Sequence, residues 1–403
     1  MRNESSRVRP TQKALWRSNA EAYLSFLDAE GSPSASFSCL ERALKAYLLW
    51  RMNRFDTWAA FGSALPTVLK NCDREIYNSM ENVLAYAHVH MLERYLRFWE
   101  VCRALVTAGV LPLRAKGIAV LDVGIGPAPA CYAIADFYRT LNEFAKARGL
   151  QDMIVSDLRV ECVDSGEAMG EFLHALSEYS ARPEGPFRVH ERDFREFDPP
   201  ARLKSALERR VRELQEDGVD NASAWIQENE PAWNESWHYD LCIFSNFFTS
   251  LGRTTELTGS ISRVFQAMRP GGLVVVVGGT GAHYPALYER LNSEAGRNCA
   301  DLVVTETQPT EHAMKEGRRA IKQHYDEVWR SLRDAVGAET AREIARKIPP
   351  EGRELHDSEA PYRAPSGFGL RVYRKRAPTP RRHLRASQQK PPPLPTNPGP
   401  LAE

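Results

Sequence analysis

Paired cysteine motifs, long apolar runs and an excess of charge of one sign are all missing from this sequence. Its seven cysteines are scattered and never form Cys-x-x-Cys, which argues against a disulfide framework or a zinc site and favours reduced thiols. No apolar run approaches the roughly 20 residues of a membrane span, and the first residues show no apolar signal segment. The net charge of +1 gives no overall attraction for nucleic acid. We therefore expect a cytoplasmic protein with neither a membrane anchor nor a metal centre.

The length of 403 residues exceeds that of a typical single domain, so a core domain with additions is expected. Composition and pattern divide the chain into a disordered N-terminus, a helical region, an α/β domain and a disordered, proline-rich basic tail, which span residues 1–12, 13–115, 116–376 and 377–403. The stretch from Arg371 to Lys390, which leads into the tail, carries eight basic residues and no acid.

The helical region shows apolar residues at helix spacing from Lys13 to about Gly109. Its strongest helix is expected from Ser79 to Ala108, with Gly109 as the residue that ends it. His88 and His90 on this helix are two residues apart and so face nearly opposite directions, which excludes chelation of one metal by this pair.

The period of the pattern changes at Ile118, where short apolar runs begin to alternate with helical segments. This alternation predicts an α/β fold with a doubly wound, mostly parallel sheet. Strands are expected at Ile118–Val123, Leu158–Val163, Phe187–Val189, Leu241–Phe244, Leu273–Val277 and Phe368–Arg374. Two segments are interpreted as insertions: Glu143–Asp157, and a helical one at 199–238 whose second half contains Trp225, Trp233 and Trp237.

The stretch Ala119–Ala130 indicates a strand, a tight turn and the start of a helix. The strand carries Asp122 near its end, and Gly124 and Gly126 follow in the turn. Glycine lacks a Cβ, so a ligand can approach the backbone closely and a positive φ costs little. In an open α/β sheet, the end of such a strand is where nucleotide-like ligands bind.

The later strands repeat this arrangement of an apolar run that ends near an acid or amide. The repeats lie in Val160–Met169, Val189–Phe194 and Tyr239–Asn246, and a further apolar run follows in Met268–Val277. Together with the first strand, this ordered series resembles the class I S-adenosylmethionine-dependent methyltransferases over about Lys116 to Gly279. The resemblance implies a Rossmann-like sheet of seven strands and S-adenosylmethionine as the cofactor.

The resemblance also assigns roles to particular residues. Asp164 would accept hydrogen bonds from the ribose diol, for which a carboxylate is well suited because such bonds are charge-assisted. Asp122 would hold the cationic amino end, directly or through water. The other expected cofactor-site residues are Gly124 and Gly126 beneath the cofactor, Ser165, Asp193 and Phe194 at the adenine, Met169 beside it, and Ser245 and Asn246 after the fourth strand.

Structural interpretations of the same residues stay open at this point. Asp164 could cap the following helix, because Asp164-Ser-Gly-Glu167 resembles a capping box. Asp193 could pair with the neighbouring arginines on the surface, Met169 could belong to the core, and Asp122 could be a turn residue.

A dinucleotide-binding site is the rival interpretation, and two residues argue against it. The third position of the Gly-x-Gly-x-x-Gly fingerprint is Pro129. Asp122 would also repel a pyrophosphate at the helix N-terminus, whereas it suits a cationic sulfonium cofactor. One departure from the methyltransferase pattern is the 38-residue step from Gly126 to Asp164, which the Glu143–Asp157 insertion is expected to absorb.

The preferred function is in-line methyl transfer to a small-molecule acceptor. An RNA or protein methyltransferase is a second hypothesis, favoured by the basic tail, and a catalytically inactive S-adenosylmethionine-binding module is a third. His283 and Tyr284 follow the fifth strand in a glycine-rich loop and are the candidate catalytic residues, with His283 as a possible general base. The N-terminal helices and the Trp-rich insertion are expected to form an acceptor pocket, a lid or a homodimer interface.

Overall fold

The computed structural model describes most of the chain. The described residues are 11–29, 34–71, 77, 79–180, 188–191, 193–216, 238–306, 311–348 and 367–377. The Trp-rich stretch and nearly all of both predicted disordered ends lie outside these ranges.

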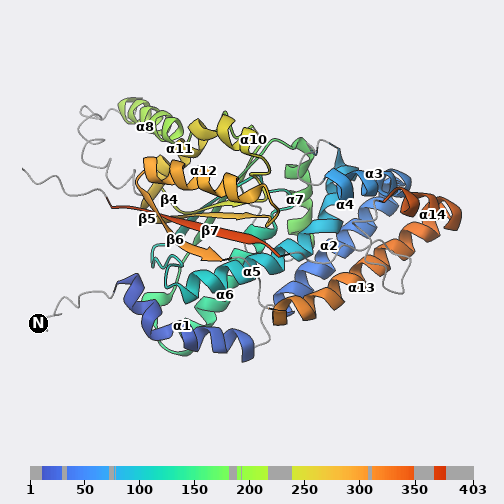
Figure 1. Cartoon of the computed structure of the whole chain (residues 1–403), viewed down its shortest axis with the longest axis horizontal. Helices are drawn as coiled ribbons and strands as arrows, with labels where there is room; N and C mark the ends of the chain where they lie inside the picture. Colours follow the sequence, from blue (N-terminus) through green and yellow to red (C-terminus); the bar gives the residue numbers. More distant parts are fainter. Residues whose placement is uncertain are drawn as a thin grey trace, which may run out of the picture.

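The described helices and strands alternate in type after a helical start (Figure 1). In chain order they are α1 (Gln12–Ala29), α2 (Ser34–Phe55), α3 (Trp58–Asn71), α4 (Met80–Tyr86), η1 (Ala87–Met91), α5 (Leu92–Thr107), β1 (Ile118–Val123), α6 (Pro129–Ala147), η2 (Gln151–Met153), β2 (Leu158–Asp164), α7 (Glu167–Ser180), β3 (Arg188–Glu191), α8 (Pro199–Glu216), β4 (Tyr239–Ser245), α10 (Leu251–Glu256), α11 (Thr258–Ala267), β5 (Met268–Gly278), α12 (Tyr284–Arg297), β6 (Ala300–Glu306), α13 (Glu311–Val336), α14 (Ala338–Lys347) and β7 (Gly369–Lys375).

The strands form one seven-stranded sheet in the order β3-β2-β1-β4-β5-β7-β6. The pairs from β3 through β5 are parallel, and β7 runs antiparallel to both β5 and β6. The mostly parallel, doubly wound sheet expected from the sequence is therefore confirmed. All six residues of β1 are buried, as expected for a central strand covered on both faces.

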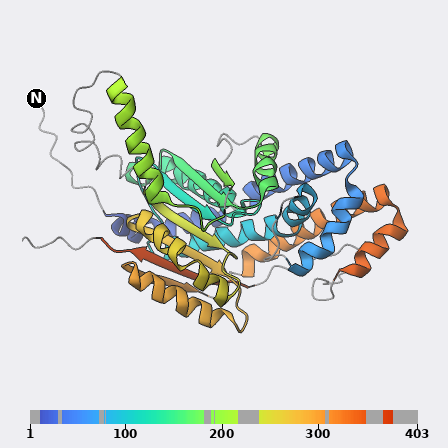
Figure 2. The ribbon, with the colours of Figure 1, turned by 90° about the horizontal axis from the view of Figure 1, so that it is seen from above.

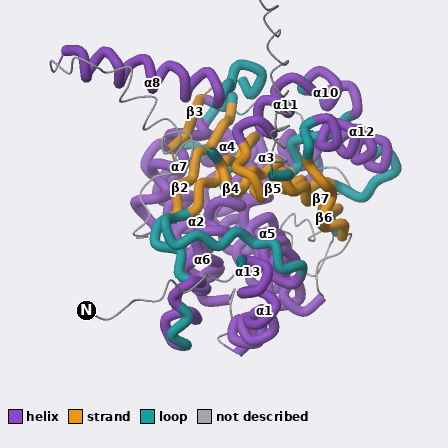
Figure 3. The backbone as a smooth tube through the Cα atoms, turned by 90° about the vertical axis from the view of Figure 1, so that its left-hand side faces the viewer, coloured by secondary structure: helices purple, strands orange, loops and turns teal. Residues whose placement is uncertain are grey.

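Alternate residues of the strands enter two separate hydrophobic clusters, one on each face of the sheet. Val120 and Ile243 belong to the cluster beneath α5, α6 and α7, whereas Leu121 and Phe244 belong to the cluster beneath α10, α11 and α12. This period of two follows from the pleat of a strand. Figure 3 shows the helices gathered on both sides of the sheet.

The helices between the last two strands of the chain do not cover the sheet. Helix α13 contacts α2, α3 and α5, and α14 contacts α3. Figures 1 and 2 show both helices extending away from the sheet beside α2 and α3. The helical part of the molecule is therefore built from both ends of the sequence. Helices α13 and α14, which come after residue 116, pack with the helices that come before it.

The long helix expected at Ser79–Ala108 is present but contains a π-helical turn. Ser79 caps α4 by accepting a hydrogen bond from the backbone N–H of Asn82 at 3.3 Å. The π turn η1 then joins α4 to α5, and Gly109 follows the end of α5 with a φ of 67°. This positive φ is the conformation for which a glycine at the helix end was expected.

Six strands lie where apolar runs placed them, and β6 was not identified from the sequence. It is an edge strand, and only two of its seven residues are buried. A strand exposed on one face carries no continuous apolar run, so the feature that identified the others is absent. The strand predicted at Leu273–Val277 is also longer than expected, because β5 has eleven residues.

Leu332 on α13 provides a test of the packing between the two ends of the sequence. Its side chain is fully buried and faces Gly62 of α3. We expect Leu332→Ala to lower the free energy of unfolding by about 2–5 kcal/mol, because it leaves a cavity. Asp334→Ala, at an exposed position of the same helix, should stay within about 0.5 kcal/mol of the wild type. Urea unfolding followed by circular dichroism measures both, and equal values for the two variants would contradict this packing.

Candidate functional site

The candidate site lies where the winding direction of the sheet reverses. From β1 the chain continues to β2 and β3 on one side, and it then returns to β4 on the other side of β1. The carboxyl ends of β1, β2 and β4 lie at one edge because these strands are parallel. Ligands of open α/β sheets bind at such a reversal. The residues predicted after these three strands are thereby brought to one edge.

The glycine turn after β1 has the expected backbone. Gly124 has a φ of 68° and Gly126 a φ of 51°, both in the left-handed region. The N–H of Gly124 donates to the carbonyl of Val163 at 2.8 Å, which ties the turn to β2. Helix α6 then begins at Pro129, a residue that suits a first helical position.

Asp164 joins this turn to the end of β2. One carboxylate oxygen accepts from the N–H of Gly126 at 3.1 Å, and the other accepts from the N–H of Gly166 at 2.8 Å. Burial raises the pKa of Asp164, and the bonds from these two N–H groups oppose that rise. The 38-residue step does not prevent Gly126 and Asp164 from meeting. Each oxygen retains a further lone pair, so acceptance from a diol is chemically possible. Ser165 beside it is exposed.

Asp122 lies below the turn, on the face covered by α6. Its side chain is only 1% exposed, and one oxygen accepts from the thiol of Cys131 at 3.2 Å. The other oxygen is buried without a hydrogen-bond partner. Burial, with a smaller contribution from the charge of Asp164, raises the pKa of Asp122 to about 7. An unpaired buried carboxylate oxygen at this place fits a cationic group, either direct or bridged by water.

Two predicted cofactor contacts are not supported by the packing. Met169 is fully buried in the core on the inner face of α7, so its side chain cannot flank a ligand in this conformation. Asp193 bonds to Arg195 at 2.7 Å, and this ion pair lowers its pKa. The arginine pairing considered for Asp193 and the core position considered for Met169 are both present. Phe194 is buried among the rings of Phe244 and Phe247.

Asn246 follows β4 and adopts a left-handed backbone with a φ of 51°. Its N–H donates to the carbonyl of Val277 at 2.7 Å. Its side-chain carboxamide lies between two arginines of α5. With its oxygen turned toward the helix, it accepts from Arg94 Nε and Arg97 Nη1, each at 3.3 Å. Ser245 before it has a buried hydroxyl with no hydrogen-bond partner.

The candidate catalytic residues lie together after β5. His283 is exposed at the start of α12, and its ring centroid is 4.4 Å from that of Tyr284. Tyr284 is buried and packs against the backbone of Gly278 and Gly279. The structure therefore places one solvent-facing imidazole, rather than a buried catalytic pair, at this end of the sheet.

The sequence predicted a lid or acceptor pocket from the N-terminal helices, but it did not identify which of their residues reach this edge. Arg94 and Arg97 of α5 are 7% and 5% exposed and reach Asn246, which lies after β4. Arg97 also pairs with Glu93. Tyr86 of α4 packs on Gly126, and Phe247 packs on Gly124. In the sequence, Arg94 and Arg97 stood out only as two arginines, three residues apart, within an otherwise largely apolar helix.

The described ranges contain no group of three or more His, Cys, Asp or Glu side chains arranged to hold a metal ion. None of the helices described there has the length and apolarity needed to cross a bilayer.

Comparison with known proteins gives similarity in structure only. No family model matches the chain, and no curated protein matches it. The magnesium protoporphyrin IX methyltransferase of Synechocystis PCC 6803, solved with bound SAM, aligns at 10% identity over 77% of this chain and 92% of its own, with a TM-score of 0.36. The [4+2]-cyclase SpnF aligns at 14% identity over 78% and 94%, with a TM-score of 0.35.

A third solved structure, the cyclopropane synthase MmaA2 of Mycobacterium tuberculosis, aligns at 10% identity over 68% of this chain and 84% of its own, with a TM-score of 0.38. At these identities and TM-scores the alignments carry no argument about the family or the reaction. The order of the strands and the residues at the edge of the sheet point to the function.

The raised pKa of Asp122 predicts how stability depends on pH. The folded protein retains a proton that the unfolded chain, with an ordinary aspartate pKa near 4, releases. Stability should therefore fall as the pH rises from about 4 to about 7, and the loss should be complete above that. One pKa unit corresponds to about 1.36 kcal/mol, so the whole effect is about 4 kcal/mol.

Asp122→Asn removes this titration. We expect the free energy of unfolding of the variant, relative to the wild type, to rise by about 4 kcal/mol between pH 4 and pH 8. Urea unfolding of both proteins across this range measures the difference. Parallel pH profiles for the two proteins would show that Asp122 has an ordinary pKa.

Proposed function

We propose that this protein is an S-adenosylmethionine-dependent methyltransferase that acts on a small-molecule acceptor. The observation that carries the proposal is the bond from the N–H of Gly126 to the carboxylate of Asp164. It joins the glycine turn to the acid after the neighbouring strand, which are the two features expected to contact one cofactor. The unpaired oxygen of Asp122 beneath the turn adds a place for a cationic group.

The residues divide into those that would hold the cofactor and those that would face the acceptor. Asp164 would accept from the ribose diol, Ser165 beside it is accessible, and Asp122 would balance the cationic amino end. When bound, S-adenosylmethionine supplies a methyl group activated by a sulfonium. Transfer in line requires mainly that the acceptor be positioned, and positioning can give large effective molarities.

The acceptor side of the edge favours a small, partly apolar molecule. The rings of Phe244, Phe247 and Phe248 contact one another with centroid distances from 4.8 to 5.7 Å; Phe247 is partly exposed, and the other two are buried beneath it in the core. Tyr284 and Tyr288 form a second aromatic group after β5. Arg97 and Asn246 add polar groups between them. A few polar groups among aromatic side chains are typical of small-molecule sites.

Three expectations from the sequence stay predictions. The first is that His283 acts as a general base, which requires an acceptor that must lose a proton; the imidazole is exposed, so an acceptor can reach it. A homodimer through the N-terminal helices also stays a prediction, and so does the cytoplasmic location.

Asp164→Ala tests the cofactor assignment by isothermal titration with S-adenosylmethionine. Loss of charge-assisted hydrogen bonds worth about 1.5–3 kcal/mol should weaken binding by roughly 10- to 150-fold. Asp193→Ala is the matched control, because its carboxylate is paired with Arg195, and it should bind within about twofold of the wild type. Circular dichroism confirms that both variants are folded.

The outcomes of this titration separate the hypotheses. Wild-type protein that does not bind S-adenosylmethionine would refute both the enzyme and the inactive binding module. Binding without transfer to any acceptor in a screen with labelled cofactor would favour the inactive module. Equal binding by Asp164→Ala and the wild type would remove Asp164 from the site.

Deletion of residues 377–403 tests the RNA or protein alternative. If the acceptor is a small molecule, transfer of label to it should not change on deletion. RNA binding that weakens steeply with salt and is lost on deletion would instead favour an RNA methyltransferase, since phosphate contacts make affinity depend on salt.

A further inference from the structure

The glycine turn is in contact with two aromatic rings of the chain itself. A Cβ placed on Gly126 would lie 2.9 Å from Cε1 of Tyr86, closer than such atoms approach in proteins. A Cβ on Gly124 would overlap the ring of Phe247. The rings therefore occupy the space that the two glycines leave free. We call Tyr86 and Phe247 the aromatic cover.

Tyr86 is held in this position from several directions. Its side chain is buried, and its ring centroid is 4.5 Å from that of Tyr77 and 4.9 Å from that of His90. Its hydroxyl accepts a hydrogen bond from Arg94, whose guanidinium lies 5.1 Å from the ring centroid. Before this helix, the carbonyl of Tyr77 approaches Gly166, in the turn after β2. This segment thus covers both turns that Asp164 joins.

Phe247 is held on the opposite side by other rings. Its centroid is 5.4 Å from that of Phe194 and 5.2 Å from that of Phe248. The guanidinium of Arg253 lies 5.3 Å from its centroid, and the charge of Arg253 also acts on Asp164. Phe247 is only partly buried. Of the two rings, Tyr86 is therefore the more firmly enclosed.

A cofactor and the aromatic cover compete for the same backbone. Glycines at this turn allow one close neighbour, and in the proposed function that neighbour is the cofactor bound between Gly126 and Asp164. The rings occupy that place here. Resting on the proposed function, we propose that Tyr86 and Phe247 close the cofactor site and swing aside when S-adenosylmethionine or its demethylated product binds.

The helix that carries Tyr86 is followed by an irregular turn at which the ring could move aside. Tyr86 is the last residue of α4, and the π turn η1 separates it from α5. Single π turns within α-helices occur frequently at functional sites, because their widened hydrogen-bond ladder is locally irregular. Arg94 lies on the α5 side of this turn, so its bond to the Tyr86 hydroxyl fastens α4 across the joint.

The cover has a measurable consequence for affinity. When only a fraction of the molecules is open, the apparent Kd equals the intrinsic Kd divided by that fraction. Removing a ring that keeps the site closed raises the open fraction. The ring's removal should therefore tighten binding and speed association, whereas loss of an ordinary contact weakens binding.

Tyr86→Ala tests this with S-adenosylhomocysteine as the probe, in the full-length protein. We expect the apparent Kd from titration to fall by about tenfold and the stopped-flow association rate constant to rise by a similar factor, the effect of a site closed about nine-tenths of the time. Tyr86→Phe keeps the ring but loses the Arg94 bond, so it should change both quantities in the same direction by less. Tyr179→Ala, which removes a half-buried ring that packs against Tyr47 at a tilted angle, is the matched control and should leave both unchanged.

Weaker binding by a folded Tyr86→Ala, or an unchanged association rate, would overturn the proposal. A measurement on the wild type covers the case in which the variants do not fold. Hydrogen exchange of residues 79–94 should become faster when the probe is bound if the cover opens, and slower exchange would contradict it. If neither the wild type nor Tyr86→Ala binds the probe, the proposed function itself fails; binding by the variant alone would support the cover.

Discussion

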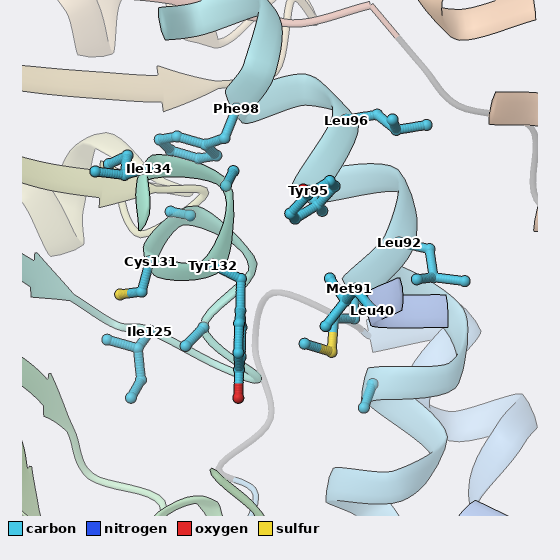
Figure 4. Packing of buried hydrophobic residues seen from close by; sticks show 14 of the residues in the cluster. Leu40, Met91, Leu92, Tyr95, Leu96, Phe98, Ile125, Cys131, Tyr132 and Ile134 are labelled. Carbon is cyan, nitrogen blue, oxygen red and sulfur yellow. The ribbon is translucent and has the colours of Figure 1, made fainter. Parts of the chain in front are cut away.

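The burial of α5 on several sides is the constraint on which the arrangement of the molecule depends. This helix contacts α1, α2, α6 and α13, and so belongs both to the layer on the sheet and to the helical part beside it. Figure 4 shows Phe98 turned toward Ile134 of α6, whereas Leu96 points away from it. Because no long face of α5 is open to water, even Arg94 and Arg97 are buried. At the edge of the sheet these two arginines bond to Asn246 and Tyr86, and Arg97 also pairs with Glu93 of its own helix.

The local sequence pattern was sufficient to predict the central strands and the glycine turn. The central strands are buried on both faces and therefore appear as apolar runs, and the turn with Gly124 and Gly126 needs residues without a Cβ. Edge strand β6 has neither property. The position of α13 and α14 beside α2 and α3 depends on contacts such as that of Lys45 with Glu327, 282 residues apart, which no local pattern specifies.

The candidate site was predictable to a similar extent. Residues fixed by a strand end, such as Asp122 and Asp164, lie at the expected edge, because the end of a parallel strand determines where its next residue lies. The roles of Asp193 and Met169 depended on side-chain direction. The side chain of Asp193 is directed by its ion pair with Arg195, two residues away. The side chain of Met169 lies on the face of α7 that packs into the core. Which residues of α4 and α5 reach the site could not be predicted, since Arg97 and Asn246 are 149 residues apart in the sequence.

The insertion of α13 and α14 between β6 and β7 has a consequence for the order in which the protein can fold during synthesis. The chain leaves the ribosome from its N-terminus, and domains generally fold as units as they emerge. Helices α2 and α3 appear first, but their partners α13 and α14 end at residue 347. Strand β7, which lies between β5 and β6, ends at residue 375. Both the helical part and the sheet therefore lack an internal member until most of the protein has been made, and their apolar faces remain open for that period.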